Sequence, residues 1–165
     1  MKLGVLVSGT GTNLQALLDA QARGELAPAE IAVVVSNKPG VAALARAAAA
    51  GVPAEVVPHA GRVRGEFEAQ LLEVLAARGV EAVVLAGFMR ILTAHFLDRF
   101  PMRVINTHPS LLPAFPGTDA PAQALAYGVK LAGVSVHFVD HGVDTGPIIA
   151  QAAVAVADDD TPHTL

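Results

Sequence analysis

Short, continuously apolar runs alternate with longer segments of helical periodicity over the first two-thirds of the chain. Uninterrupted hydrophobicity over about four to eight residues is typical of strands buried on both faces of a parallel sheet. The runs predict strands at Leu3–Val7, Glu30–Ser36, Ala54–Pro58, Ala82–Ala86 and Arg103–Thr107. The segments between them predict helices at Asn13–Arg23, Val41–Ala50, Glu66–Arg78 and near Thr93–Phe100, with Thr93 as the N-cap.

Beyond residue 108 the pattern changes, because prolines and glycines interrupt the chain. A short helix is predicted at Pro121–Tyr127. Two apolar runs follow, Gly133–Val139 and Ile148–Val156, and their connection is too short for a helical crossover, so we expect an antiparallel pair. The pattern predicts an α/β fold whose mixed sheet is parallel in its N-terminal half and antiparallel in its C-terminal strands. Residues 158–165 resemble a helix N-cap, so we expect the chain to end before that helix.

The composition excludes several classes of protein. A chain of 165 residues, 53% of them hydrophobic and only 4% aromatic, is expected to form one domain (1–165) with an aliphatic core. The net charge of −4 and the dispersed basic residues argue against nucleic-acid binding. The absence of cysteine excludes disulfides and cysteine nucleophiles. No apolar run reaches the roughly 20 residues of a membrane span, so we expect a cytoplasmic protein with no membrane partner.

A glycine-rich loop, Ser8-Gly-Thr-Gly-Thr-Asn13, joins the first predicted strand to the first helix. Backbone N–H groups at a helix N-terminus bind anions, so Gly11, Thr12 and Asn13 are candidate ligands of a phosphate. A dinucleotide-binding loop would have a small residue where Leu14 stands, and the Gly-Lys-Ser/Thr of a nucleoside-triphosphate loop is missing. The loop therefore predicts a cradle for a single phosphate, or else a tight turn without a ligand.

Asn106, His108 and Asp144 are the candidate catalytic residues. Alternate side chains of a strand share a face, so Asn106 and His108 point the same way, and Pro109 places His108 at the strand's exit. An imidazole can move protons at neutral pH, an amide can donate to an oxyanion, and a carboxylate favours the imidazolium. This combination fits acyl-group transfer. The spacing alone does not bring Asp144 to His108, and each residue also fits a structural role at a strand end or turn.

Other polar residues have simpler interpretations. We expect His137 to be a structural, hydrogen-bonded histidine, and neither Ser8 nor Ser110 lies in a nucleophile elbow. Metal-ligand motifs are missing, so no metal site is expected. The segment Gly87–Leu92 follows a predicted strand at the carboxyl edge of the sheet. It could line a pocket for a flat heterocycle or simply lead into the next helix.

A set of sequence blocks runs almost from end to end of the chain. These blocks are Val5-Leu-Val-Ser-Gly-Thr-Gly-Thr-Asn-Leu-Gln15, Leu85-Ala-Gly-Phe-Met-Arg-Ile-Leu92, Asn106-Thr-His-Pro-Ser-Leu-Leu-Pro113, and Gly133-Val-Ser-Val-His-Phe-Val-Asp140 followed by Asp144-Thr-Gly-Pro147. Together they resemble the glycinamide ribonucleotide transformylases (phosphoribosylglycinamide formyltransferases), a folate-dependent formyltransferase family with a Rossmann-like fold. The third block is shared with other enzymes that use formyltetrahydrofolate, whereas the first is more particular to this family.

The resemblance implies transfer of formyl from the co-substrate 10-formyltetrahydrofolate to the amine of 5-phosphoribosylglycinamide, in purine biosynthesis and one-carbon metabolism. Gly11, Thr12 and Asn13 match the substrate-phosphate loop, and the candidate catalytic residues match the family's catalytic positions. Positions that match the folate site are Arg64, Met89, Arg90, Ile91, Leu92, Asn106, Asp140, His141, Gly142, Val143 and Asp144. The implied path is direct amine attack, with no metal and no covalent enzyme intermediate. A monomer and a homodimer both remain open.

Two departures and two alternatives qualify these expectations. Asp119 stands where many members have His, and the family continues beyond residue 165 through a helix with an acidic residue near the substrate amine. A formyltetrahydrofolate deformylase would give formyl to water, although such enzymes usually carry an additional N-terminal domain. An inactive phosphate- or folate-binding module is the alternative from another class. The methionyl-tRNA formyltransferases are longer and carry a basic domain, which does not fit this chain.

Overall fold

The chain divides into two units, Met1–Val104 and Ile105–Leu165. Parallel strands form the sheet of the first unit. The computed structural model describes residues 1–165. The strands of the first unit, in spatial order, are β3 (Ala54–Val56), β2 (Glu30–Ser36), β1 (Lys2–Val7) and β4 (Ala82–Leu85). The apolar runs of the sequence therefore do form a buried parallel sheet.

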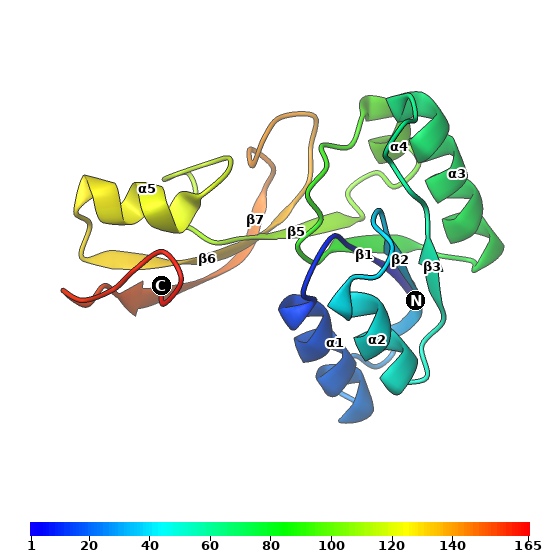
Figure 1. Cartoon of the computed structure of the whole chain (residues 1–165), viewed down its shortest axis with the longest axis horizontal. Helices are drawn as coiled ribbons and strands as arrows, with labels where there is room; N and C mark the ends of the chain where they lie inside the picture. The colour runs from blue at the N-terminus through cyan, green and yellow to red at the C-terminus, as the bar shows by residue number, and fades with distance from the viewer. The chain divides into compact units, whose positions relative to one another are not determined.

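Helices cover both faces of this sheet (Figure 1). The helices α1 (Thr12–Ala22) and α2 (Ala42–Ala49) lie side by side on one face, and α3 (Arg64–Ala77) and α4 (Ala94–Leu97) lie on the other. Val5 and Val7 of β1 belong to the apolar cluster with α1 and α2. Gly4 and Leu6, which alternate with these valines, face the opposite side of the sheet, and a Cβ at Gly4 would meet Leu75 of α3 at 2.6 Å. The missing side chain at Gly4 thus lets α3 approach the sheet.

Most predicted elements are present, and their ends shift by a few residues. The helix α3 begins at Arg64, before the predicted Glu66, although the intervening glycine disfavours helix. Thr93 lies at the N-cap of α4, as predicted, but its side chain does not cap the helix. Instead, its backbone N–H donates to the buried carboxylate of Glu68 at 2.8 Å, and its hydroxyl donates to the same group.

The second unit contains antiparallel strands, β5 (Val104–His108), β6 (Leu131–Phe138) and β7 (Ile148–Ala155), in that spatial order, and the helix α5 (Ala120–Tyr127). The register pairs Asn106 with His137 and His108 with Ser135. The predicted antiparallel pair is confirmed, and so is the α/β fold class with its parallel and antiparallel parts. A single formyltransferase domain over residues 1–165 stays a prediction.

The helices of both units fall short of a membrane span in length or apolar character. The cytoplasmic location stays a prediction.

We expect Gly11→Ala to destabilise the first unit. Gly11 has a left-handed backbone (φ 75°), and a Cβ there would meet the Cβ and Cα of Ala43 in α2 at 2.7 and 2.8 Å. Because both the conformation and the contact oppose a side chain, the free energy of unfolding should fall by about 1–2 kcal/mol. Urea unfolding followed by circular dichroism measures this loss.

Gly9→Ala is the matched control. A Cβ at Gly9 would meet no heavy atom within 4 Å, and its backbone is outside the left-handed region. Its effect should stay within about 0.5 kcal/mol. Equal losses in the two variants would contradict the packing argument.

Candidate active site

The glycine-rich loop lies between the end of β1 and the start of α1. Gly11 is the N-cap of α1, and no side chain caps this helix, so its first N–H groups have no partner within it. The loop lines a cavity of about 170 Å³ together with Ala86, Gly87 and Met89. Arg46 of α2 donates from Nε to the Thr10 carbonyl at 2.9 Å. Sequence reasoning missed this cation, because only the packing of α2 brings it to the loop.

A buried hydroxyl connects this loop to the segment after β4. The Ser8 Oγ donates to Asn37 Oδ1 at 2.7 Å and accepts the backbone N–H of Met89 at 2.9 Å. Ser8 and Asn37 are only 5% and 2% exposed. The Ser8 hydroxyl therefore has a structural role here.

The first unit also holds the predicted folate-binding residues that precede β5. Met89 and Ile91 are 71% and 63% exposed, which leaves apolar side chains available at the carboxyl end of the sheet. Leu92 is 8% exposed, so little of its surface is available to a ligand. Arg64 is exposed in the first turn of α3, and Arg90 is half-buried.

The candidate catalytic residues lie together in the second unit. Asn106 and His108 are on β5, and Asp144 lies in the loop between β6 and β7 with a left-handed backbone (φ 54°). The His108 Nδ1 is 3.4 Å from the Asp144 Oδ2, and the two side chains are only 6% and 12% exposed. The tertiary structure thus brings Asp144 to His108, which the sequence spacing could not establish. Their catalytic roles stay predictions.

Both ring nitrogens of His108 face hydrogen-bond acceptors. The Nε2 is 2.9 Å from the carbonyl oxygen of Phe115, and the Nδ1 faces the Asp144 carboxylate. A carbonyl and a carboxylate can only accept, so an imidazole protonated at both nitrogens satisfies both partners. The backbone N–H of Gly117 donates to the same Asp144 oxygen at 2.8 Å. His108 and Asp144 thus lie in a buried, hydrogen-bonded cluster.

His137 belongs to the same cluster, which sequence reasoning did not anticipate. Its ring is buried and hydrogen-bonded, as predicted, but the Nε2 lies 3.3 Å from the Asn106 Nδ2 and 3.6 Å from the Asp144 Oδ1. The sequence did contain a clue, because His137 lies in the block Gly133 to Asp140. If the strand of that block pairs with the strand of Asn106, one of its residues must lie opposite Asn106, and in the structure that residue is His137.

The remaining predicted folate residues form an exposed turn after β6. The Asp140 Oδ1 accepts the Thr145 hydroxyl at 2.7 Å and the Gly142 N–H at 3.0 Å, and His141 and Val143 are exposed. The hydrogen bond from Thr145 is the main reason why the pKa of Asp140 lies below its usual value. The turn therefore carries an ionised carboxylate at neutral pH.

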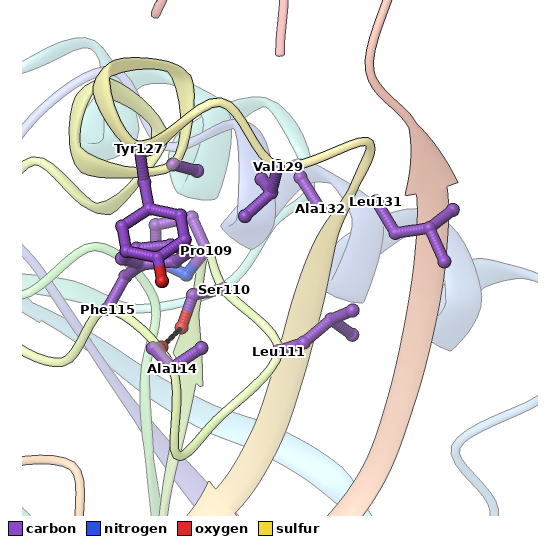
Figure 2. A pocket seen from close by; sticks show the side chains of 10 residues that line it. Pro109, Ser110, Leu111, Ala114, Phe115, Tyr127, Val129, Leu131 and Ala132 are labelled. Atoms are coloured by element: carbon purple, nitrogen blue, oxygen red, sulfur yellow. Dashed lines mark hydrogen bonds between the residues drawn. The ribbon is translucent and has the colours of Figure 1, made fainter.

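A larger cavity of about 410 Å³ lies elsewhere in the second unit (Figure 2). It is lined by residues of the loop after β5, of α5 and of β6, and none of the candidate catalytic residues lines it. The Ser110 hydroxyl, beside the cavity, donates to the Ala114 carbonyl at 2.6 Å. Because no candidate catalytic residue lines this mostly apolar cavity, it is distinct from the candidate active site.

No group of three or more His, Asp or Glu side chains is placed to hold a metal ion. Metal-free catalysis stays a prediction. Asp119, the departure from the family pattern, lies exposed at the N-cap of α5 with a left-handed backbone (φ 56°).

We expect Thr145→Val to raise the pKa of Asp140 toward its usual value, because it removes the main hydrogen bond that favours the carboxylate. The lowered pKa means that the ionised group stabilises the folded turn above the unfolded-state pKa. That contribution is lost as the pH falls through the folded-state pKa. NMR titration of the Asp140 carboxyl carbon measures the change. Thr145→Ser, which keeps the hydroxyl, should preserve the low pKa; an identical rise in both variants would contradict the assignment.

Comparison with known proteins places these features in a family. The Formyl transferase family model matches residues 1–165. The chain is 49% identical over 165 residues to phosphoribosylglycinamide formyltransferase of Mycobacterium tuberculosis, covering 99% of this chain and 75% of the relative. It is 48% identical over 168 residues to the trifunctional purine biosynthetic protein adenosine-3 of Drosophila melanogaster. That match covers 99% of this chain but only 12% of the much longer relative.

The structure is similar to a crystal structure of glycinamide ribonucleotide transformylase 1 from Symbiobacterium toebii. The TM-score is 0.96 at 51% sequence identity, and the match covers 99% of this chain and 77% of the other. The resemblance that the sequence blocks indicated is therefore confirmed, and the chain belongs to the formyl transferase family.

Proposed function

We propose that this chain transfers formyl from 10-formyltetrahydrofolate to the amine of 5-phosphoribosylglycinamide, a step of purine biosynthesis. The observation that carries the proposal is the buried pair of His108 and Asp144, with Asn106 on the same strand as His108. The names of the similar proteins support this choice of reaction. The buried imidazole, amide and carboxylate match the needs of an acyl transfer through a tetrahedral intermediate.

The proposed reaction is a direct displacement. The lone pair of the substrate amine attacks the formyl carbon, and the carbonyl π electrons move onto the formyl oxygen. The tetrahedral intermediate collapses when the bond between carbon and the folate N10 breaks. The attacking nitrogen loses one proton and N10 gains one, so the products are the formamide and tetrahydrofolate.

Asn106 and His108 act on this intermediate in the proposal. The Asn106 N–H and the protonated His108 ring stabilise the negative charge on oxygen, and His108 then helps to deliver the proton to N10. In the structure the His108 Nε2 faces the Phe115 carbonyl, so this role requires that hydrogen bond to break when substrate binds. Asp144 compensates the charge of the His108 imidazolium, in keeping with the 3.4 Å between them.

Each unit carries proposed substrate-binding residues. In the first unit, the N–H groups of Gly11, Thr12 and Asn13 bind the substrate phosphate, and the guanidinium of Arg46 adds positive charge beside that loop. The proposed folate-binding residues are Arg64 and Met89 to Leu92 in the first unit, and Asn106 and Asp140 to Asp144 in the second. The proposal includes no metal, and it accommodates a monomer or a homodimer.

The first test is turnover of 10-formyltetrahydrofolate by the purified chain, followed by absorbance, with and without 5-phosphoribosylglycinamide. We expect turnover only when the ribonucleotide is present. Folate breakdown without it would instead favour the deformylase. Ligand binding without any turnover would favour an inactive binding module.

A second test removes the imidazole. His108→Ala should lower kcat by about 10²- to 10⁴-fold, the usual contribution of a general acid or base. His95→Gln is the control, because His95 is exposed on α4 and should leave kcat unchanged. Normal turnover by the His108 variant would refute the assignment.

A further inference from the structure

One ring nitrogen of His137 faces a hydrogen-bond acceptor, and the other faces a hydrogen-bond donor. Its ring is 1% exposed, on β6 directly opposite Asn106 of β5. The Nδ1 is 2.9 Å from the carbonyl oxygen of Phe138, and the Nε2 is 3.3 Å from the Asn106 Nδ2. A buried ring with a defined partner at each nitrogen has little freedom to change its orientation.

These partners determine where the ring proton lies. The Phe138 carbonyl can only accept a hydrogen bond, so the Nδ1 of His137 must carry the proton. The amide nitrogen of Asn106 can only donate, so the Nε2 must present its lone pair. One neutral tautomer, protonated at Nδ1, satisfies both contacts.

The same contact orients the Asn106 amide. An amide nitrogen has two N–H donors in a fixed plane, and His137 accepts one of them. The second N–H remains available, and its direction is set because the first is held. Without the Nε2 lone pair, the amide could turn by 180° about its last torsion and exchange its oxygen and nitrogen positions.

If His137 is neutral, His108 is the only one of the two rings that can form an ion pair with Asp144. The Asp144 Oδ1 is 3.6 Å from the His137 Nε2, and its Oδ2 is 3.4 Å from the His108 Nδ1. A proton on the Nε2 of His137 would place two imidazolium rings beside one carboxylate. The tautomer that orients Asn106 is thus the one that does not compete for Asp144.

We propose that His137 is a positioning residue: its Nε2 accepts one N–H of Asn106 and thereby holds the other N–H toward the developing oxyanion. This inference rests on the proposed formyl transfer for its catalytic consequence, whereas the tautomer follows from the contacts alone. The two parts are tested separately.

The first experiment is long-range ¹H–¹⁵N NMR of the imidazole rings in the ¹⁵N-labelled wild-type chain. We expect His137 to be protonated at Nδ1 and unprotonated at Nε2 at neutral pH. A proton on Nε2, alone or together with Nδ1, would overturn the proposal whether or not the chain has activity. An inactive chain with the expected tautomer would count against the proposed function and not against the tautomer.

The second experiment is a double-mutant cycle on kcat with Asn106→Ala and His137→Leu. We expect His137→Leu alone to lower kcat by about 10- to 100-fold, with a small change in the KM for the ribonucleotide. In the Asn106→Ala background, His137→Leu should cost almost nothing further, because the group that it positions is already gone.

His137→Gln is the conservative variant, since its side-chain oxygen can accept the Asn106 N–H, and it should retain more activity than His137→Leu. A purely structural role would instead give losses that multiply in the double variant and no rescue by Gln. That result in an active, folded wild-type background would overturn the positioning role while leaving the proposed function intact.

Discussion

A largely buried carboxylate, Asp144, organises the polar interior of the second unit. Removing a carboxylate from water is costly unless donors surround it, and leaving such a charge uncompensated costs several kcal/mol. Here the Gly117 N–H donates to its Oδ2 at 2.8 Å, and the Nδ1 of His108 faces the same oxygen at 3.4 Å, whereas the ring of His137 lies 3.6 Å from Oδ1. These neighbours come from β5, β6 and the loop before α5, which are distant from one another in the sequence.

The backbone around this carboxylate is correspondingly constrained. Asp144 and Phe115 both have left-handed conformations, which non-glycine residues adopt at a cost of roughly 1 kcal/mol or more. At Gly146, a Cβ would lie 1.8 Å from the carbonyl oxygen of Phe138, so only glycine permits this close approach. The strained positions thus include Asp144 itself and Phe115, whose carbonyl oxygen faces the Nε2 of His108.

In the first unit, small residues at helix contacts position the polar groups, whereas in the second unit the Asp144 carboxylate is at the centre of the polar cluster. Gly11 and Ala43 allow α2 to pack against the glycine-rich loop, and that packing brings Arg46 to the loop. Ser8 and Asn37 fix the segment that contains Met89. Close packing and hydrogen bonds thus support the proposed phosphate-binding loop in the first unit, and a hydrogen-bonded network surrounds the proposed proton-transfer groups in the second.

Local pattern was sufficient for the elements, the order of parallel and antiparallel parts, and the family, because hydrophobic period, turn residues and motif spacing are encoded within short stretches. It also placed Asn106 and His108 on one face of a strand and the proposed phosphate-binding N–H groups at the start of α1. Tertiary structure alone decided that Asp144 reaches His108, that His137 faces Asn106, that Arg46 flanks the loop and that Leu92 is buried. Those facts depend on strand register and helix packing between residues far apart in the chain, and no local property of the sequence encodes such distances.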